Sequence, residues 1–374
     1  MAFRVPGAPP RHSPAAAAAP ARRRPHESGG FPPTPAGGAV NLLRQRLGER
    51  GVLMADGGIG TGLFARGLES GESPEIWNLE HPDAVRDLHR EFLDAGADIL
   101  LTNSFGANRF RLALHGRETA VAELCLAAAA LAREAAARSD RRVVVAGSMG
   151  PTGEVLQPVG SCSPAAARDA FFEQAEALAR GGVDLLWIET VSSAEELEVA
   201  VEAAAATGLP VVATMSFDTG GRTMMGITPE QAIMLARGLV APPVAFGANC
   251  GTGPAGLVAA ILAMRRVAAP GEILVAKANC GIPVFEDGAV RYSGTPEVMG
   301  RYARLARAAG ARIIGGCCGT TGEHLRAMRA ALDLPRSDPP PDPATIERLL
   351  GTLPAAAAGR GRTRPRRRRR RAPG

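Results

Sequence analysis

The chain has 374 residues, of which 46% are hydrophobic and 4% aromatic, and its formal net charge is +6. The length suits one large domain or two ordinary ones, and no apolar run approaches the ~20 residues that a membrane-spanning helix needs. Nine Arg within 360–371 and five within 1–38 carry the positive charge, so the chain between these ends is net acidic. Composition therefore excludes a membrane protein and gives no reason to expect a specific nucleic-acid partner, although an Arg run can hold anionic surfaces non-specifically.

Six cysteines occur in the chain, at positions 125, 162, 250, 280, 317 and 318. A chain of this length is not a small disulfide scaffold, and the region before residue 42 holds arginines without the apolar core of a secretory signal. We therefore expect a cytoplasmic protein with reduced thiols, in which the cysteines serve metal binding or catalysis rather than disulfides.

The two ends of the chain, 1–38 and 336–374, are rich in Pro, Ala, Gly and Arg, a composition typical of disordered segments. Between them, short apolar runs alternate with helical segments. The runs are nearly continuous in Val, Ile, Leu and Ala, as strands buried on both faces are. We expect strands at 51–56, 98–105, 142–147, 184–189, 210–217, 243–250, 272–279 and 312–317. The expected helices are 81–95, 119–137, 164–180, 194–206, 229–238, 256–267, 296–309 and 322–332.

Eight strand-then-helix units within residues 39–335 match a (β/α)8 TIM barrel of class α/β in number and length, built as a single domain. Thr228-Pro229 and Thr295-Pro296 mark helix starts, because each places a capping hydroxyl before a Pro at the first helical position. An open, doubly wound sheet is the alternative. It is disfavoured because the glycines at 57, 58 and 60 lack the spacing and the distal acid of a dinucleotide site.

Polar and glycine residues cluster directly after most of the predicted strands. The carboxyl ends of the strands meet at one face of a parallel barrel, and the active sites of such barrels lie there. The repetition therefore predicts a functional site at this face. The clusters are Asp56-Gly57-Gly58, Thr102-Asn103-Ser104, 147–153, Glu189-Thr190, Asn249-Cys250-Gly251, Asn279-Cys280-Gly281 and 315–319.

Three cysteines at this face have the chemistry of a metal site. Cys250 ends the sixth predicted strand, and Cys317 and Cys318 end the eighth, so the three side chains lie within reach of one another. Three thiolates supply three corners of a tetrahedral Zn²⁺ site and leave the fourth open, which is typical of catalytic rather than structural zinc. Adjacent cysteines on a strand point to opposite faces, so the chain must bend there, and the flanking glycines permit the bend.

The residues alone leave alternatives to this zinc site. Cys280 ends the seventh predicted strand and is placed as well as Cys250. Cys317 and Cys318 could form the vicinal disulfide of a thiol redox enzyme, and any of these cysteines could be a small buried hydrophobe. A non-catalytic zinc-binding barrel is a further interpretation.

A zinc site with one open position suits the activation of a thiol substrate. A free thiol has a pKa near 8.5, so little of it is nucleophilic at neutral pH, and coordination to zinc removes its proton. Sulfur ligands keep the ion electron-rich, so the bound sulfur stays nucleophilic. The matching reaction is displacement of an alkyl group from a charged donor, and loss of charge in that step favours a dry site.

Taken together, the motifs resemble the homocysteine S-methyltransferase family over about residues 40–334. The most specific are Gly-Gly-Cys-Cys-Gly-Thr at 315–320 and Gly-Ala-Asn-Cys at 247–250, and the segments at 56–61, 102–105, 147–153 and 189–190 agree. The resemblance implies a (β/α)8 barrel, a Zn²⁺ cofactor on Cys250, Cys317 and Cys318, and methyl transfer to homocysteine that gives methionine.

The resemblance also implies roles for four further residues. Asp56 and Glu189 match acids near the amino group of homocysteine, and Gly57 and Phe105 match positions that line the substrate. Cys280 stands where the family commonly has Ala, which disfavours it as a ligand. The implied partners are homocysteine and a small methyl donor, and formation of a homo-oligomer stays open.

The methyl donor is the least determined partner. The segments at 73–78 and 279–283 look like those of bacterial betaine–homocysteine methyltransferases, which favours betaine, with S-methylmethionine as the alternative. The animal betaine enzymes have Tyr at the positions of Gly106 and Thr190, and an onium donor prefers an aromatic cage. Trp77 and Tyr292 are expected in loops on the same face, where they could replace these tyrosines or serve ordinary loop packing.

Lys277 is the only lysine of the chain, and it lies near the end of the seventh predicted strand. In a chain so biased toward Arg, a retained lysine indicates either chance survival or a need for its compact ammonium group.

Overall fold

The computed structural model describes residues 36–286, 289–335 and 339–353. All the described residues belong to one compact unit. Most of the disorder expected for 1–38 and 336–374 falls outside the described residues, but the expectation is wrong at 36–38, where helix α1 (Ala36–Arg50) begins. No helix in the described part of the chain combines the length and apolarity that crossing a bilayer requires.

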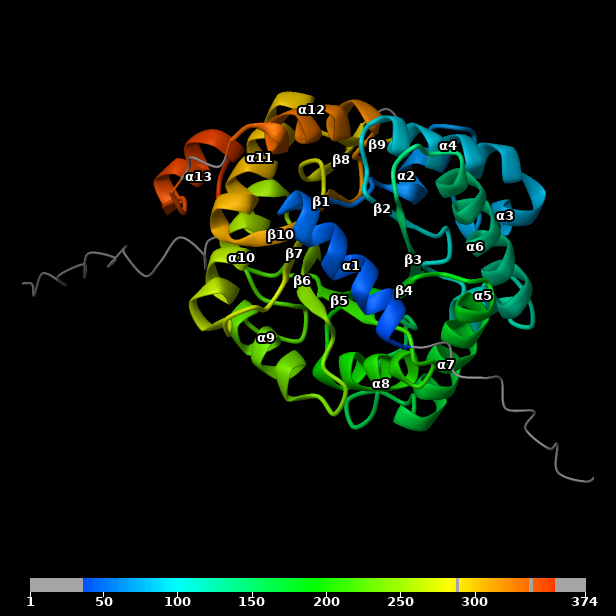
Figure 1. Ribbon diagram of the computed structural model, residues 1–374. Helices are drawn as coiled ribbons and strands as arrows, with labels where there is room; N and C mark the ends of the chain where they lie inside the picture. The colour runs from blue at the N-terminus through cyan, green and yellow to red at the C-terminus, as the bar shows by residue number, and fades with distance from the viewer. Residues whose placement is uncertain (1–35, 287–288, 336–338, 354–374) are drawn as a thin grey trace, which may run out of the picture. The chain divides into compact units, whose positions relative to one another are not determined.

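Eight parallel strands form the predicted (β/α)8 barrel (Figure 1). The strands follow the order β1-β10-β7-β6-β5-β4-β3-β2 in the sheet. A parallel bridge between Ala55 and Ile99 joins β1 to β2, the two strands at the ends of this order. The sheet closes on itself, so the open doubly wound sheet is wrong. The strands are β1 (Leu53–Met54), β2 (Ile99–Leu101), β3 (Val144–Met149), β4 (Leu185–Val191), β5 (Val211–Met215), β6 (Ala245–Cys250), β7 (Leu274–Ala278) and β10 (Ala311–Gly316).

Eight long helices surround the strands, each within two residues of its predicted bounds. Ser163, Ser193, Thr228 and Thr295 each accept a hydrogen bond from a backbone N–H of the first helical turn, which fixes where these helices begin. The helices are α4 (Pro82–Asp94), α6 (Val121–Ala137), α7 (Pro164–Arg180), α8 (Ala194–Ala205), α9 (Pro229–Gly238), α10 (Pro254–Val267), α11 (Pro296–Ala309) and α12 (Gly322–Asp333).

Several elements lie outside the sequence prediction. A two-stranded antiparallel hairpin, β8 (Pro283–Glu286) and β9 (Ala289–Tyr292), follows β7. Helix α13 (Pro343–Leu350) occupies part of 336–374, so the prediction of a disordered tail is wrong there, and Asp342 caps this helix. The remaining elements are the longer helix α1 (Ala36–Arg50) and the short α2 (Ile59–Phe64), η1 (Pro74–Ile76), α3 (Trp77–Glu80) and α5 (Arg109–Ala113).

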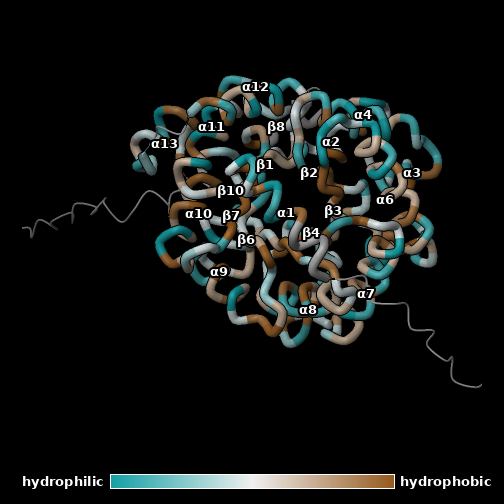
Figure 2. The backbone as a smooth tube through the Cα atoms, viewed as in Figure 1, coloured by the Kyte–Doolittle hydropathy of each residue, from teal (hydrophilic) through white to brown (hydrophobic). Residues whose placement is uncertain are grey.

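The strands separate two cores because successive residues of a strand point to opposite faces. Outward residues pack with the helices, and inward residues such as Leu185, Trp187 and Val275 fill the barrel. Figure 2 shows hydrophobic residues along the central strands. Helix α1 crosses the ring of strands in Figure 1, and its Leu43 and Leu47 join the interior core, so this helix closes the barrel at the amino ends of the strands.

A buried ion-pair cluster lies at the same closed end. Asp98 precedes β2, is 1% exposed, and accepts a 2.9 Å hydrogen bond from the backbone N–H of Met54. Four guanidinium groups approach its carboxylate within 3.7 Å. They belong to Arg46, Arg50, Arg141 and Arg329.

Candidate active site

The inward-pointing residues change from apolar to polar at the carboxyl ends of the strands. On β4, Glu189 follows two residues after Trp187, which lies in the barrel interior. On β7, Lys277 follows two residues after Val275, which also lies in the interior. The period of two along a strand therefore gives these polar side chains the same face as the core below them. They line a cavity of about 210 Å³ at this end of the barrel.

The cavity gathers side chains from six of the strand ends that the sequence singles out. Its lining consists of 57–61, Pro74, Glu75, 101–105, Ser148, Glu189, Thr190, Cys250, Lys277, Cys317 and Cys318. The three cysteines, Glu189, Gly57 and Phe105 thus face a common space. Asp56 is not among the described residues that line it.

The three cysteine thiols form a group whose sulfur atoms all lie within 4.8 Å of one another. The Sγ atoms of Cys250 and Cys317 are 3.1 Å apart. In a tetrahedron with Zn–S bonds of about 2.3 Å, the sulfur atoms are about 3.8 Å apart, so the group fits a zinc ion. It is the only group of three or more potential metal ligands within the residues that the structure describes.

A bend at the end of β10 brings the two adjacent cysteines to the same side. The N–H of Cys317 donates to the carbonyl oxygen of Ala278, and the N–H of Cys318 donates to Oδ1 of Asn279. Gly319 follows with a φ of 78°, a left-handed conformation that glycine adopts without strain. All six cysteines are free thiols, so the structure contains no Cys317–Cys318 disulfide.

The other cysteines lie apart from this group. Cys280 is fully buried, and its thiol donates to the carbonyl oxygen of Gly294 at 3.1 Å, away from the cavity. Cys125 is buried within α6, and burial raises the pKa of its thiol far above the usual range. By contrast, hydrogen bonds from Cys250 and Cys317 lower the pKa of the Cys318 thiol, so the group stabilises one thiolate by itself.

Strained backbone at the ends of β4 and β6, the two strands on either side of β5, turns side chains toward the cavity. Thr190 has a φ of 67° and Cys250 a φ of 57°, values that are uncommon outside glycine. The Asn249 side chain holds this arrangement, because it accepts the N–H of Thr190 at 2.8 Å and donates to the Thr190 hydroxyl at 2.7 Å. Buried Asn249 is therefore a further residue of the site. It belongs to the sequence motif at 247–250, but the motif gave no indication that its side chain fixes the backbone at Thr190.

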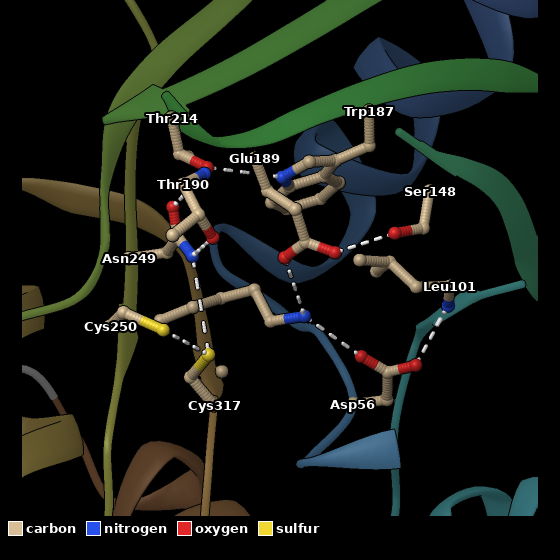
Figure 3. Close-up of polar contacts among 12 residues, drawn as sticks. Asp56, Leu101, Ser148, Trp187, Glu189, Thr190, Thr214, Asn249, Cys250 and Cys317 are labelled. Carbon is tan, nitrogen blue, oxygen red and sulfur yellow. Dashed lines mark hydrogen bonds and ion pairs between the residues drawn. The ribbon is translucent and has the colours of Figure 1, made fainter. Parts of the chain in front are cut away.

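Two buried acids, Asp56 and Glu189, lie near the cysteines (Figure 3), and both are within 4.0 Å of the Lys277 ammonium group. Asp56 accepts the N–H of Leu101 at 2.7 Å and a hydrogen bond from Lys277 Nζ at 3.1 Å. Glu189 accepts the Ser148 hydroxyl at 2.6 Å, and its second oxygen is 4.0 Å from Lys277 Nζ. Asp56, Lys277 and Glu189, here called the acid–lysine triad, are 0%, 2% and 7% exposed.

Burial controls the ionisation of both acids. Loss of hydration raises the pKa of the Glu189 carboxyl to about 7, although the Lys277 ammonium and the Ser148 hydroxyl act in the opposite direction. Burial also raises the pKa of Asp56, against the pull of Lys277 and the hydrogen bond from Leu101. Burial by itself would lower the pKa of Lys277, but the charges of Asp56 and Glu189 together raise it above its usual value, so the lysine is charged.

Gly57 and Phe105 lie where the sequence expects them. A side chain at Gly57 would put its Cβ 2.5 Å from the carbonyl oxygen of Thr320, so only glycine allows this approach of two backbone segments. Phe105 lines the cavity, and the Arg111 guanidinium lies 5.5 Å from its ring centroid.

One lining residue was not predicted as part of the site. Glu75 is 5% exposed and accepts hydrogen bonds from the N–H of Gly106 and the Ser73 hydroxyl, both at 2.6 Å. It adds a carboxylate to the cavity wall, and only its place in the 73–78 segment could have pointed to it.

Trp77 and Tyr292, the two candidates for an aromatic cage around an onium donor, lie in different surroundings. Trp77 is 6% exposed, packs against His81 with ring centroids 4.4 Å apart, and is not among the described residues that line the cavity. Tyr292 ends β9, and its hydroxyl contributes to lowering the pKa of the Cys318 thiol. Of the two, only Tyr292 lies at the cysteine group.

Comparison with known proteins gives one consistent family. The family model described as homocysteine S-methyltransferase matches residues 53–332. Betaine–homocysteine S-methyltransferase 1 of Danio rerio is 33% identical over 320 residues, which are 80% of this chain and 77% of that protein. The methionine synthase of Mycobacterium tuberculosis is 32% identical over 312 residues. The chain spans about a quarter of the length of this synthase and of that from Mycobacterium leprae.

A solved structure has the same architecture. The metallated form of the homocysteine methyltransferase MmuM from Escherichia coli superposes with a TM-score of 0.66 at 27% sequence identity. The match covers 78% of this chain and 99% of that chain.

Proposed function

The chain belongs to the homocysteine S-methyltransferase family, and from this membership we propose that it transfers a methyl group from a small onium donor, betaine, to homocysteine, with Zn²⁺ held by Cys250, Cys317 and Cys318. It is a methyltransferase enzyme. The observation that carries the proposal is the group of three thiols within 4.8 Å of one another, in the wall of the same cavity as Glu189. The product would be methionine.

The residues divide the work between binding and activation. When bound to the three thiolates, zinc would lower the pKa of a substrate thiol, so that its sulfur is nucleophilic at neutral pH. Glu189 would receive the ammonium group of homocysteine, since it lines the cavity beside the cysteines and carries a negative charge when ionised. Asn249 would keep the metal-binding end of β6 in its strained conformation, with its amide 4.0 Å from Cys317 Sγ.

A cationic donor suits the rest of the cavity. Glu75 supplies a carboxylate and Phe105 an aromatic face, both of which attract an onium group. Methyl transfer cancels the positive charge of the onium group against the negative charge of the thiolate. The barrel interior below the cavity is filled with apolar side chains and excludes water, which favours a step that loses charge. S-methylmethionine has the same onium character and is the alternative donor.

Metal analysis and a donor panel test the proposal together. Purified enzyme should contain about one zinc per chain and form methionine from homocysteine with betaine, while dimethylsulfonio compounds and S-methylmethionine serve as competing donors. Cys250→Ala should lose both the zinc and at least about a thousandfold in rate, and Cys280→Ala is the matched control from the neighbouring strand. Zinc binding without turnover on any donor would instead support a non-catalytic zinc-binding barrel.

A further inference from the structure

Lys277 occupies an unusual place for the only lysine of the chain. It lies inside the barrel at 2% exposure, with Nζ 3.1 Å from Asp56, 4.0 Å from Glu189 and 5.5 Å from the centre of the Trp187 ring. A buried ammonium group requires compensating charge, and here two carboxylates surround it.

The charges of the acid–lysine triad do not cancel. With both acids ionised, two negative charges face one positive charge, and the triad keeps one negative charge in a largely dehydrated space. An α-amino acid brings one ammonium group, which would bring the triad to neutrality. A ligand without an ammonium group would leave the buried negative charge uncompensated.

The two acids are unequally engaged. Both oxygens of Asp56 have hydrogen-bond donors, one from the backbone of Leu101 and one from Lys277, and Asp56 is set back from the cavity wall. Glu189 lines the cavity, and within the described part of the chain only its Oε1 accepts a short hydrogen bond, that from Ser148. Its Oε2 lies 4.0 Å from Lys277 Nζ, too far for a hydrogen bond, and therefore retains acceptor capacity.

We infer that Lys277 is a positioning residue that determines which thiol substrate is bound. Its ammonium group forms an ion pair with Asp56 and leaves Glu189 Oε2 free to accept a hydrogen bond from one ammonium group of a ligand. The cavity therefore selects thiols of the α-amino acid class. This inference rests on the proposed function, because it concerns the thiol substrate of the same cavity. It departs from the expectation that both acids serve the amino group alike. Asp56 acts through Lys277 rather than on the substrate.

Calorimetric binding of two ligands tests the inference without depending on turnover. Homocysteine is compared with 4-mercaptobutanoate, which is the same thiol acid without the amino group, on the zinc-loaded enzyme. The wild-type protein should prefer homocysteine, and Lys277→Met should reduce that preference at least about tenfold. Without the ammonium group of Lys277, two carboxylates would compete for one proton and Glu189 would no longer present a fixed anionic oxygen.

A double variant separates positioning from general damage. Lys277→Met combined with Asp56→Asn removes one positive and one negative charge, keeps an acceptor for the N–H of Leu101, and leaves Glu189 as the single charge. It should recover most of the lost preference for homocysteine. Arg329→Met, which removes a cation from the Asp98 cluster at the other end of the barrel, is the control that should leave the preference unchanged.

The outcomes distinguish the inference from the function on which it rests. Equal weakening of both ligands in Lys277→Met, or no recovery in a double variant with wild-type circular dichroism, would overturn the role of Lys277. Failure of the wild-type protein to bind homocysteine at all would instead overturn the proposed function.

Discussion

The barrel buries an aspartate at each end, and the two aspartates serve different purposes. Asp98 precedes β2 and accepts the N–H of Met54, whereas Asp56 follows β1 and accepts the N–H of Leu101. Each side chain therefore links β1 to β2, where the two strands share a bridge and few other backbone bonds. In this respect the two ends are equivalent.

They differ in the charge that surrounds the carboxylate. Four arginines approach Asp98, so positive charges outnumber the carboxylate there, and we expect the loss of one arginine to leave enough counter-charge. One lysine approaches Asp56 and is shared with Glu189, so acid is the majority and the cation is unique. An end with surplus acid can attract a cationic ligand, whereas an end with surplus cations holds its acid for stability alone. Three substitutions and one change of pH test this difference between the two ends.

The largest expected effect is on stability, at the closed end. Asp98→Asn should lower the free energy of unfolding by about 3 kcal/mol or more, because partly buried arginines lose their shared counter-charge. Urea unfolding measures this change, with Asp94→Asn at an exposed position as the control. The kcat/KM for homocysteine of the folded enzyme should stay within about twofold, and a loss confined to kcat/KM would contradict the contrast.

At the open end, the same type of substitution should act on function instead. Glu189→Gln should lower kcat/KM for homocysteine about 100-fold, or about 2.7 kcal/mol, because a charged acceptor for the ammonium group is lost. Its free energy of unfolding should be unchanged or higher, since a buried carboxylate no longer requires dehydration. Steady-state kinetics and urea unfolding give both quantities, and a destabilised variant with normal kinetics would show that Glu189 is structural.

A smaller effect follows from the pKa of Glu189, which is raised to about 7. Only the ionised carboxylate attracts an ammonium group, so affinity is full above pH 7 and falls as pH decreases through that value. Methionine, the proposed product, keeps its own charges between pH 6 and 8, so its dissociation constant should rise about tenfold from pH 8 to pH 6. Calorimetry should find no such slope in Glu189→Gln; a slope of equal size there would assign the titration to another group.

The smallest effect tests whether cations at the closed end are replaceable. Arg50 lies 3.5 Å from Asp98, and its side chain is 28% exposed. Arg50→Met should lower the free energy of unfolding by less than about 1 kcal/mol, because three other arginines remain and solvent screens this one. Thermal unfolding would measure the change, and a loss near that of Asp98→Asn would mean that the arginines act as one unit.

The sequence was sufficient for the barrel and for the convergence of the cysteines. Buried strands and capped helices leave local patterns, and the geometry of a parallel barrel then places every strand end at one face. The hairpin β8–β9 and helix α13 were missed because they lie in short segments where loop and tail composition dominates. The barrel-closing role of α1 has no local signal, since it depends on Leu43 and Leu47 meeting residues from distant strands.

The acid–lysine triad shows where local reasoning ends. Asp56 was predicted beside the substrate, but its partners Leu101 and Lys277 lie 45 and 221 residues away in the chain. Both contacts depend on tertiary structure. Together they supply a hydrogen-bond donor to each oxygen of the Asp56 carboxylate, which the sequence motif could not show. Lys277 was noticed only because the chain contains no other lysine.

That solitary lysine also affects how the protein can be labelled. Reagents that attack primary amines can react with one lysine, Lys277, which is 2% exposed in the wall of the cavity, and with the α-amino group of the chain. Because so little of this side chain is exposed, acylation at position 277 would mark chiefly molecules whose barrel has opened, and mass spectrometry of that single peptide could count them.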